Sequence, residues 1–369
     1  MTGRVLQFPL TPRSLSEAAI EAARILALPP EERDGPAIEK AMEEPELLLA
    51  VCASLRCRLE TGPAEVRDEA EFFYKWIDVP ERTVGVFDEK EYFLGETALL
   101  AGSASRILFR RDEARRWFDR SETAFRHTVN AIADWARVAY QRLALRTEER
   151  EFEEVLELLP SLVETFRKLG MSNEALKCRF LEGVIDLNTQ RYDKAVCLFR
   201  EISVEARRLK NESLLAVACN NLVSLQGLLG HSEEALEQAQ ETLKVFQQLD
   251  NRVGLAKLQC GIGILMRTRG NLAGAIEAIR AAKEGFVALQ MRSDVATMSL
   301  LLADLELDTG DERGAIRELL TALPVIQAEN MVPEGMAAWS LLQESVRHRR
   351  VDRDALRQLH GYFENRRPT

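Results

Sequence analysis

The residues best suited to chemistry are few in this chain, and they stand far apart. None of its four histidines has a cysteine or carboxylate at a spacing that suits a metal site: His127, His231, His348 and His360. Cys52 and Cys57 are five residues apart and would not face each other on a helix. A phosphate-binding glycine loop, a Gly-x-Ser-x-Gly elbow and a His-Glu-x-x-His motif are all missing from the sequence. We therefore expect no catalytic residues, no metal and no cofactor.

Charge and aromatic residues argue against a nucleic-acid partner. The net charge is −10, whereas phosphate contacts need a basic surface. Aromatic residues gather in 72–76 and 117–135, but neighbouring side chains on a helix point to different faces, so we interpret them as core. The arginine-rich segments Arg106–Arg120 and Arg347–Arg367 are interpreted as solvated helix faces or ends. We expect no nucleic-acid partner.

The sequence predicts neither secretion nor a membrane span. Residues 1–11 lack a basic segment followed by an apolar run, and no stretch approaches eighteen uninterrupted apolar residues. The cysteines have no framework spacing and are interpreted as small hydrophobic residues of a reducing compartment: Cys52, Cys57, Cys178, Cys197, Cys219 and Cys260. We expect a cytoplasmic protein with no membrane contact.

A repeat of forty residues is the strongest pattern in the chain. Alanines that follow a polar turn recur at this spacing without an insertion: Ala195, Ala235, Ala275, Ala315 and Ala355. Forty residues suit two helices of about seventeen residues joined by short turns. Five residues before three of these alanines stand Gly230, Gly270 and Gly310, and glycine readily takes the left-handed conformation that ends a helix.

Other positions keep the same spacing. Small residues lie twelve residues before the alanine position, where they let the two helices of a hairpin approach closely: Gly102, Gly183, Gly263 and Ala303. A residue able to cap a helix precedes each new first helix: Ser172, Asn211, Asn251 and Ser293. Together these offsets predict a stack of helical hairpins.

A small residue, a twelve-residue gap, an alanine and a glycine at the turn resemble the tetratricopeptide repeat, most clearly in 216–235. The spacing exceeds the common thirty-four residues. It is similar to the variety in kinesin light chain, maltose-regulator-like activators and Rap-type peptide-sensing regulators. The resemblance is strong from Phe152 to Ala322. It implies an all-α, right-handed superhelical solenoid of about seven helix pairs with an irregular helical N-terminal region.

We expect two regions along the chain. Residues 1–88 are predicted to form a helical N-terminal region that caps the solenoid or takes part in interactions. Residues 89–369 are predicted to form the solenoid, with its clearest repeats at 152–322. The terminal units need an atypical outer face, because an exposed repeat end would leave apolar surface in water.

A partner is expected to bind on the first helices, which line the concave face of such a solenoid. The alanine register places these candidate contacts there: Lys177, Asn188, Asn220, Asn221, Ser224, Lys257, Arg267 and Asp304. Asparagine offers a donor and an acceptor, so it can hold a peptide backbone whatever its side chains. In families with similar repeats asparagines do this, and Asn221 falls on the usual position. Taken singly, each of these polar residues is expected to be a solvated surface group more often than a contact, whereas the groove as a whole is the expected binding place.

The leading hypothesis is a non-catalytic adaptor or regulator that holds a protein or peptide in its concave groove. One alternative is a peptide-responsive sensor resembling the Rap-type regulators. Another is a regulatory subunit of a protease, nuclease or sigma factor. The partner and the oligomeric state are left open at this point.

Overall fold

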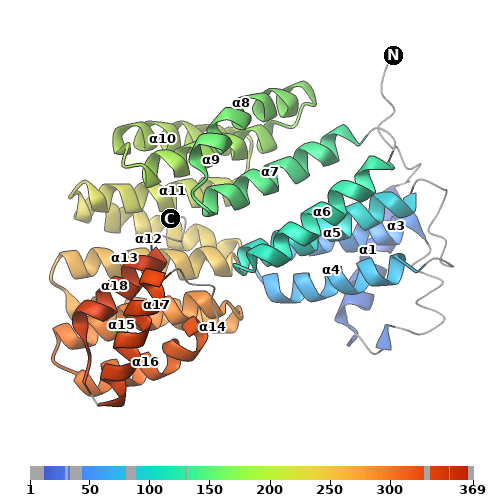
Figure 1. Cartoon of the computed structure of the whole chain (residues 1–369). Coiled ribbons are helices and arrows are strands. Elements are labelled where there is room, and N and C mark those ends of the chain that lie inside the picture. Colours follow the sequence, from blue (N-terminus) through green and yellow to red (C-terminus); the bar gives the residue numbers. More distant parts are fainter. Residues whose placement is uncertain are drawn as a thin grey trace. The chain divides into compact units, whose positions relative to one another are not determined.

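A computed structural model describes residues 12–29, 32–33, 44–79, 89–128, 131–327, 333–348 and 350–364. All regular structure in those ranges is helical, in seventeen helices (Figure 1). The expected all-α solenoid is confirmed. The chain divides into two compact units, Met1–Leu145 and Arg146–Thr369. The boundary expected between residues 88 and 89 lies inside the first unit, next to residues outside the described ranges.

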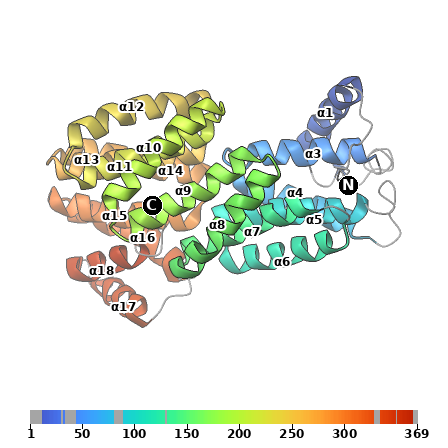
Figure 2. The ribbon, with the colours of Figure 1, turned by 90° about the horizontal axis from the view of Figure 1, so that it is seen from above.

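The first unit is a helical bundle without a strict repeat. It holds α1 (Pro12–Ala27), α3 (Pro45–Arg58), α4 (Pro63–Ile77), α5 (Glu89–Ile107), α6 (Arg111–Arg126) and most of α7 (Ile132–Glu148). Helix α5 packs against α3, α4 and α6 (Figure 2). Glycines on α5 permit the close approach to α6, because a side chain at Gly102 would clash with the ring of Phe118.

The second unit contains the repeat. It holds α8 (Phe152–Lys168), α9 (Ser172–Asn188), α10 (Tyr192–Arg208), α11 (Glu212–Leu228), α12 (Ser232–Gln248), α13 (Arg252–Thr268), α14 (Leu272–Ala288), α15 (Arg292–Asp308), α16 (Glu312–Gln327), α17 (Pro333–Arg347) and α18 (Arg353–Glu364). From α8 to α15 every helix has 17 residues. Because each helix begins twenty residues after the previous one, all of these helices are equivalent in length and spacing.

A residue with positive φ, in the left-handed backbone conformation, follows each helix and sets the spacing between helices. It recurs every twenty residues: Arg150, Gly170, Gln190, Lys210, Gly230, Asp250, Gly270, Gln290 and Gly310. At the first glycine the amide of Met171 donates to the carbonyl of Phe166 at 2.8 Å, and that of Gly170 to Arg167 at 3.0 Å. This pair of bonds satisfies carbonyls that the helix end leaves free. The predicted glycine turns are confirmed, and non-glycine residues take the same conformation at the weaker repeats.

Three-residue turns also decide which residue can cap the next helix. The side chains of Asn211 and Asn251 accept from the amides of Leu214 and Gly254 at 3.0 and 2.7 Å, so these predicted caps are confirmed. The predictions for Ser172 and Ser293 are wrong. Both serines lie inside their helices, because the fixed turn length puts Met171 and Met291 at the cap positions.

The predicted seam between paired helices is confirmed. All five alanines of the register are 0–2% exposed: Ala195, Ala235, Ala275, Ala315 and Ala355. Opposite Ala195, a side chain at Gly183 would meet the ring of Phe199 at 2.9 Å. The small residues therefore leave the space that larger residues of the facing helix fill.

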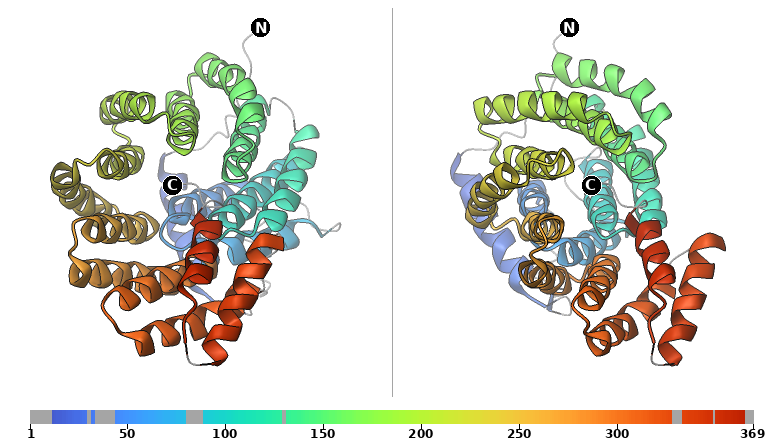
Figure 3. Two further views of the ribbon diagram at one scale, coloured as in Figure 1. Left: turned by 60° about the vertical axis from the view of Figure 1, so that its left-hand side comes forward. Right: turned by 90° about the vertical axis from the view of Figure 1, so that its left-hand side faces the viewer.

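Within the second unit the first helices form the inner layer. Helix α11 packs against α10 and α12, its neighbours along the chain, and also against α9 and α13 (Figure 3). Helices on the inner side of a curved stack lie closest together, which identifies α9, α11 and α13 as that side. The candidate contacts lie on these helices and on α15.

Candidate functional site

The asparagines of the inner layer are partly committed to their own helices. The side-chain amides of Asn188 and Asn221 donate to the carbonyls of Val184 and Val217 at 2.8 and 2.9 Å. Asn221 is only 5% exposed, so it mainly supports α11. Asn220 is half-buried, and its side chain makes no hydrogen bond to another described residue. Of the two adjacent amides, Asn220 is therefore the more available to a partner.

Two lysines on the inner layer carry positive charge that nothing nearby compensates. Lys177 on α9 is half-buried, and Lys257 on α13 is exposed. Neither forms an ion pair within the described residues. Ser224 lies between them on α11 and donates to the carbonyl of Asn220 at 3.3 Å. This part of the inner layer can attract a carboxylate, because its lysines have no internal competitor.

Large apolar side chains are also exposed on α11 and α13. Leu228 on α11 is 59% exposed, and Ile264 on α13 is 41% exposed. Leu228 follows Ser224 by four residues and Ile264 follows Lys257 by seven, so each shares a helix face with a candidate contact. The sequence analysis missed Leu228, although its forty-residue offset from Asn188 marks it. We call Lys177, Asn220, Ser224, Leu228, Lys257 and Ile264 the open surface.

The remaining candidates, Arg267 and Asp304, pair with each other instead of facing solvent separately. Arg267 also binds Asp308 at 2.8 Å. Two arginines of α18 complete the group, with Arg353 Nε 3.1 Å and Arg357 Nε 3.6 Å from Asp304 Oδ1. We call these five residues the closed cluster.

Electrostatics favour the charged form of Asp304. Burial alone would raise the pKa of Asp304, but the hydrogen bonds and charges of Arg267 and Arg353 outweigh it and lower the pKa. The acid is therefore ionised at neutral pH and holds α13, α15 and α18 together. Sequence reasoning missed both arginines of α18, although their spacing of four places them on one helix face.

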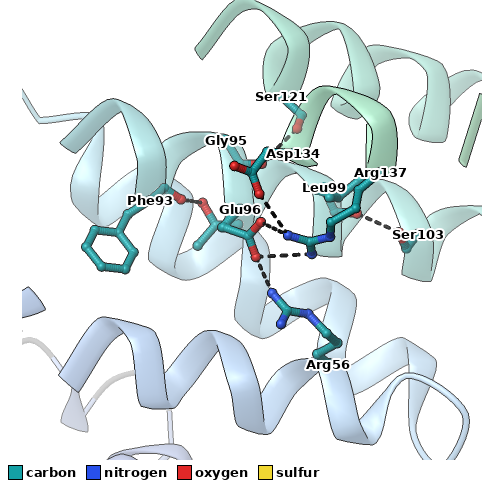
Figure 4. A network of polar contacts seen from close by, with 10 residues as sticks. Arg56, Phe93, Gly95, Glu96, Leu99, Ser103, Ser121, Asp134 and Arg137 are labelled. Atoms are coloured by element: carbon teal, nitrogen blue, oxygen red, sulfur yellow. Dashed lines mark hydrogen bonds and ion pairs between the residues drawn. The ribbon is translucent and has the colours of Figure 1, made fainter. Parts of the chain in front are cut away.

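A second buried carboxylate, in the first unit, was also missed. Glu96 on α5 is 1% exposed and lies between Arg56 of α3 and Arg137 of α7 (Figure 4). A second nitrogen of Arg137 lies 3.3 Å from Glu96, and Asp134 lies 3.2 Å from Arg137. Burial opposes ionisation, yet the two arginines lower the pKa of Glu96. The available signal was that Glu96 is the one acid between Tyr92 and Ser105, a stretch of otherwise apolar, small or uncharged residues.

The buried thiols are not activated for chemistry. Burial, followed by the charge of a nearby glutamate, raises the pKa of both Cys52 and Cys178 to about 12. These thiols remain protonated and poorly nucleophilic at neutral pH. No group of three or more potential metal ligands occurs among the described residues. Within the same residues, no helix is long and apolar enough to cross a membrane.

Known proteins share part of this sequence and much of this fold. No family model matches the chain. Over 142 residues the chain is 30% identical to the regulatory protein RapD of Bacillus subtilis (strain 168). That match covers 38% of this chain and only 38% of the relative. A solved Rap protein complexed with Competence and Sporulation Factor is similar in structure, with a TM-score of 0.61 and 13% identity over 95% of this chain and 96% of that one. The chain thus has a fold similar to that of the solved Rap protein.

Proposed function

We propose that the chain is a non-catalytic regulator that binds a peptide, or a segment of a partner protein, on the open surface. The observation that carries this proposal is the combination of uncompensated lysines with exposed apolar side chains on the inner layer. Lys177 and Lys257 lack ion-pair partners in the described chain, and Leu228 and Ile264 are exposed on helices of the same layer. Exposed apolar residues rimmed by polar groups are typical of interaction sites.

The same residues define the chemistry of the partner segment. The lysines suit a carboxylate, either an acidic side chain or a free C-terminus. Leu228 and Ile264 suit apolar side chains, which gain free energy when they leave water. Asn220 can bond to the backbone of the segment. A short acidic and apolar peptide therefore fits best.

A peptide-responsive sensor is the second candidate. The solved Rap protein with the similar fold is complexed with a signalling factor, and the partly matching relative is a regulatory protein. In a sensor, the bound peptide changes the arrangement of the solenoid. We expect small-angle scattering to show a changed radius of gyration with a saturating peptide, whereas an unchanged radius favours a plain adaptor.

A cytoplasmic location is part of this proposal. None of the six cysteines, all of which lie in the described ranges, forms a disulfide, and Cys57 and Cys197 are exposed. Exposed free thiols persist in a reducing compartment. This agrees with a regulator that meets its partner inside the cell.

The test starts from a phage library of random linear peptides panned against the full chain. The affinity of the selected peptides is then measured by fluorescence anisotropy for the wild type and for Lys177→Glu with Lys257→Glu. We expect a loss of roughly tenfold or more in the double variant, because two attractive charges become repulsive. Asn220→Ala should lose affinity by a smaller factor.

Lys244→Glu is the matched control, because Lys244 is exposed on α12 in the outer layer. It changes the net charge in the same direction without touching the open surface. Selected peptides that bind the Lys177 and Lys257 double variant as tightly as the control would show that the open surface is not the binding site.

A further inference from the structure

The last helix of the chain breaks the packing rule of the repeat. Along the second unit, each second helix packs on the first helix that follows it, as α10 does on α11 and α14 on α15. Helix α18 packs on its hairpin partner α17 and, in addition, on α15, three helices earlier in the chain. No other pair of helices in the described part of the second unit packs across that separation to a comparable extent. The position of α18 therefore needs a cause outside the repeat.

Charge supplies part of that cause. Asp304 and Asp308 of α15 are one helical turn apart, and Arg353 and Arg357 of α18 have the same spacing. Arg353 contacts both acids, and Arg357 contacts Asp304. The two pairs match in sign and in spacing.

Apolar contacts complete the match. Leu356 and Leu359 of α18 are 0% exposed and belong to one cluster with Leu300 and Ala303 of α15. Helix α18 thus presents arginines beside a strip of leucines. This is the pattern of an amphipathic helix that carries two arginines beside its apolar strip.

The surface that α18 covers corresponds to the open surface of earlier repeats. Ile264 lies forty residues before Asp304 and is 41% exposed, and Ser224, forty residues earlier again, is half-buried. On α15, by contrast, every residue from Ala296 to Glu306 is buried. The inner layer therefore has an open part on α9, α11 and α13 and a part on α15 that is already occupied.

We propose that α18 is a tethered ligand: it occupies a site on α15 that fits an amphipathic helix with arginines four residues apart, and a partner segment of that chemistry displaces it. The effect of displacing α18 rests on the proposed function, because displacement uncovers inner-layer surface next to the open surface.

Charge favours a cation at this site. Without α18, the carboxylates of Asp304 and Asp308 would face Arg267 alone within the described residues, so the site would carry one excess negative charge. This charge attracts a replacement cation. While α18 is attached, its local concentration is high, so a free peptide competes poorly.

The test uses a fluorescent synthetic peptide that copies residues 350–364 and the full chain carrying Arg353→Glu with Arg357→Glu. The reversed charges repel α18 from the acids and open the site. We expect the peptide to bind this variant roughly tenfold more tightly than the wild type, because the tethered competitor is weakened. A peptide with glutamine in place of both arginines should lose this binding.

Two variants serve as controls. Adding Asp304→Asn and Asp308→Asn to the opened chain should abolish the tighter binding. Reversing the exposed Arg200 and Arg207 of α10 should leave the affinity at the wild-type value. Hydrogen exchange in α18 should also be faster in the opened chain than in the α10 control.

Equal affinity of the peptide for the opened and wild-type chains, or unchanged exchange in α18, would overturn the inference. Such a result leaves the proposed function intact, since its own test concerns Lys177 and Lys257 and uses different peptides. Failure of the phage-selected peptides to depend on those lysines would instead remove the proposed function, whatever the α18 peptide does.

Discussion

The two compact units hold buried carboxylates in different ways. In the first unit Glu96 is 1% exposed and is held by arginines of α3 and α7. In the second unit the side chain of Asp304 is 10% exposed, and its arginines Arg353 and Arg357 are 35% and 56% exposed, whereas Arg137 and Arg56 are 21% and 47% exposed. The two sites therefore differ mainly at the acid, because Glu96 is sealed inside the bundle and Asp304 is covered by α18.

This difference distinguishes a charged side chain that stabilises the fold from one that can take part in regulation. A sealed carboxylate has no alternative partner, so loss of its arginines leaves an unpaired buried charge. A covered carboxylate near solvent can exchange one arginine for another at small cost. We therefore expect variants at Glu96 to change stability and variants at Asp304 to change access.

The largest expected effect is that of Glu96→Gln. The amide cannot balance Arg137 and Arg56, so we expect the first unit to lose about 3 kcal/mol of unfolding free energy. Urea unfolding followed by tryptophan fluorescence is a suitable measurement, since three of the four tryptophans, Trp76, Trp117 and Trp135, lie in this unit.

Glu113→Gln is the control for this comparison. Glu113 pairs with Arg67 at 2.8 Å, and both side chains are 21% exposed. Its loss should cost less than about 1 kcal/mol, because solvent compensates both groups. Equal losses at Glu96 and Glu113 would remove the distinction between sealed and accessible charge.

The next largest effect is expected at the seam between paired helices of the second unit. It tests whether this unit depends on close packing there and not on a buried charge. A methyl group at Gly263 would lie 2.6 Å from Ile279 and 3.2 Å from the carbonyl oxygen of Ala275. We expect Gly263→Ala to cost about 2 kcal/mol by overpacking. Thermal unfolding followed by far-ultraviolet circular dichroism measures it.

Gly261 provides a matched site on the same helix. A methyl group there meets no atom within 4 Å, so Gly261→Ala should stabilise α13 by about 0.5–1 kcal/mol through helix propensity. If both substitutions destabilise the chain equally, the glycines of the repeat do not act through seam packing.

A smaller effect is expected at the turns. Lys210 has a φ of 54°, a left-handed conformation that costs a residue with a side chain more than glycine. Lys210→Gly should therefore stabilise the second unit by about 1 kcal/mol, and Gly230→Ala, at a φ of 85°, should destabilise it by a similar amount. The same thermal unfolding experiment decides the sign. A loss of stability in Lys210→Gly would mean that its side chain contributes more than its backbone strain costs.

The parts that could be predicted from sequence are those governed by local spacing. Helix length, turn position and the small residues of the seam all repeat every twenty or forty residues, and each has a local physical cause. The turn at Gly230 and the buried seam position of Ala235 could be predicted from sequence for this reason. The cap positions of Met171 and Met291 were not predicted, because the position of the turn overrides the capping preference of the nearby Ser172 and Ser293.

The candidate site was only partly accessible to the same reasoning. Lys177 and Lys257 could be placed on the inner layer from the register alone, and their role in binding remains a prediction. The pairing of Arg353 with Asp304 spans 49 residues and breaks the repeat. Periodicity carries no information about such a contact. Glu96 was missed for a similar reason, since the first unit has no register to place it.

The smallest stability effect should come from Asp304→Asn with Asp308→Asn, at less than about 1 kcal/mol, because the arginines that lose a partner are near solvent. The pKa of Asp304 is lowered in the folded chain, so its contribution is present above the ordinary carboxyl pKa and is lost as pH falls below it. The protection factor of the α18 amides, which compares the observed exchange rate with the intrinsic rate at the same pH, should therefore fall between about pH 5 and pH 3 in the wild type. The double variant should exchange faster at neutral pH and respond less to acid. A wild-type α18 whose protection stays constant over this range would show that its leucines alone hold it on α15.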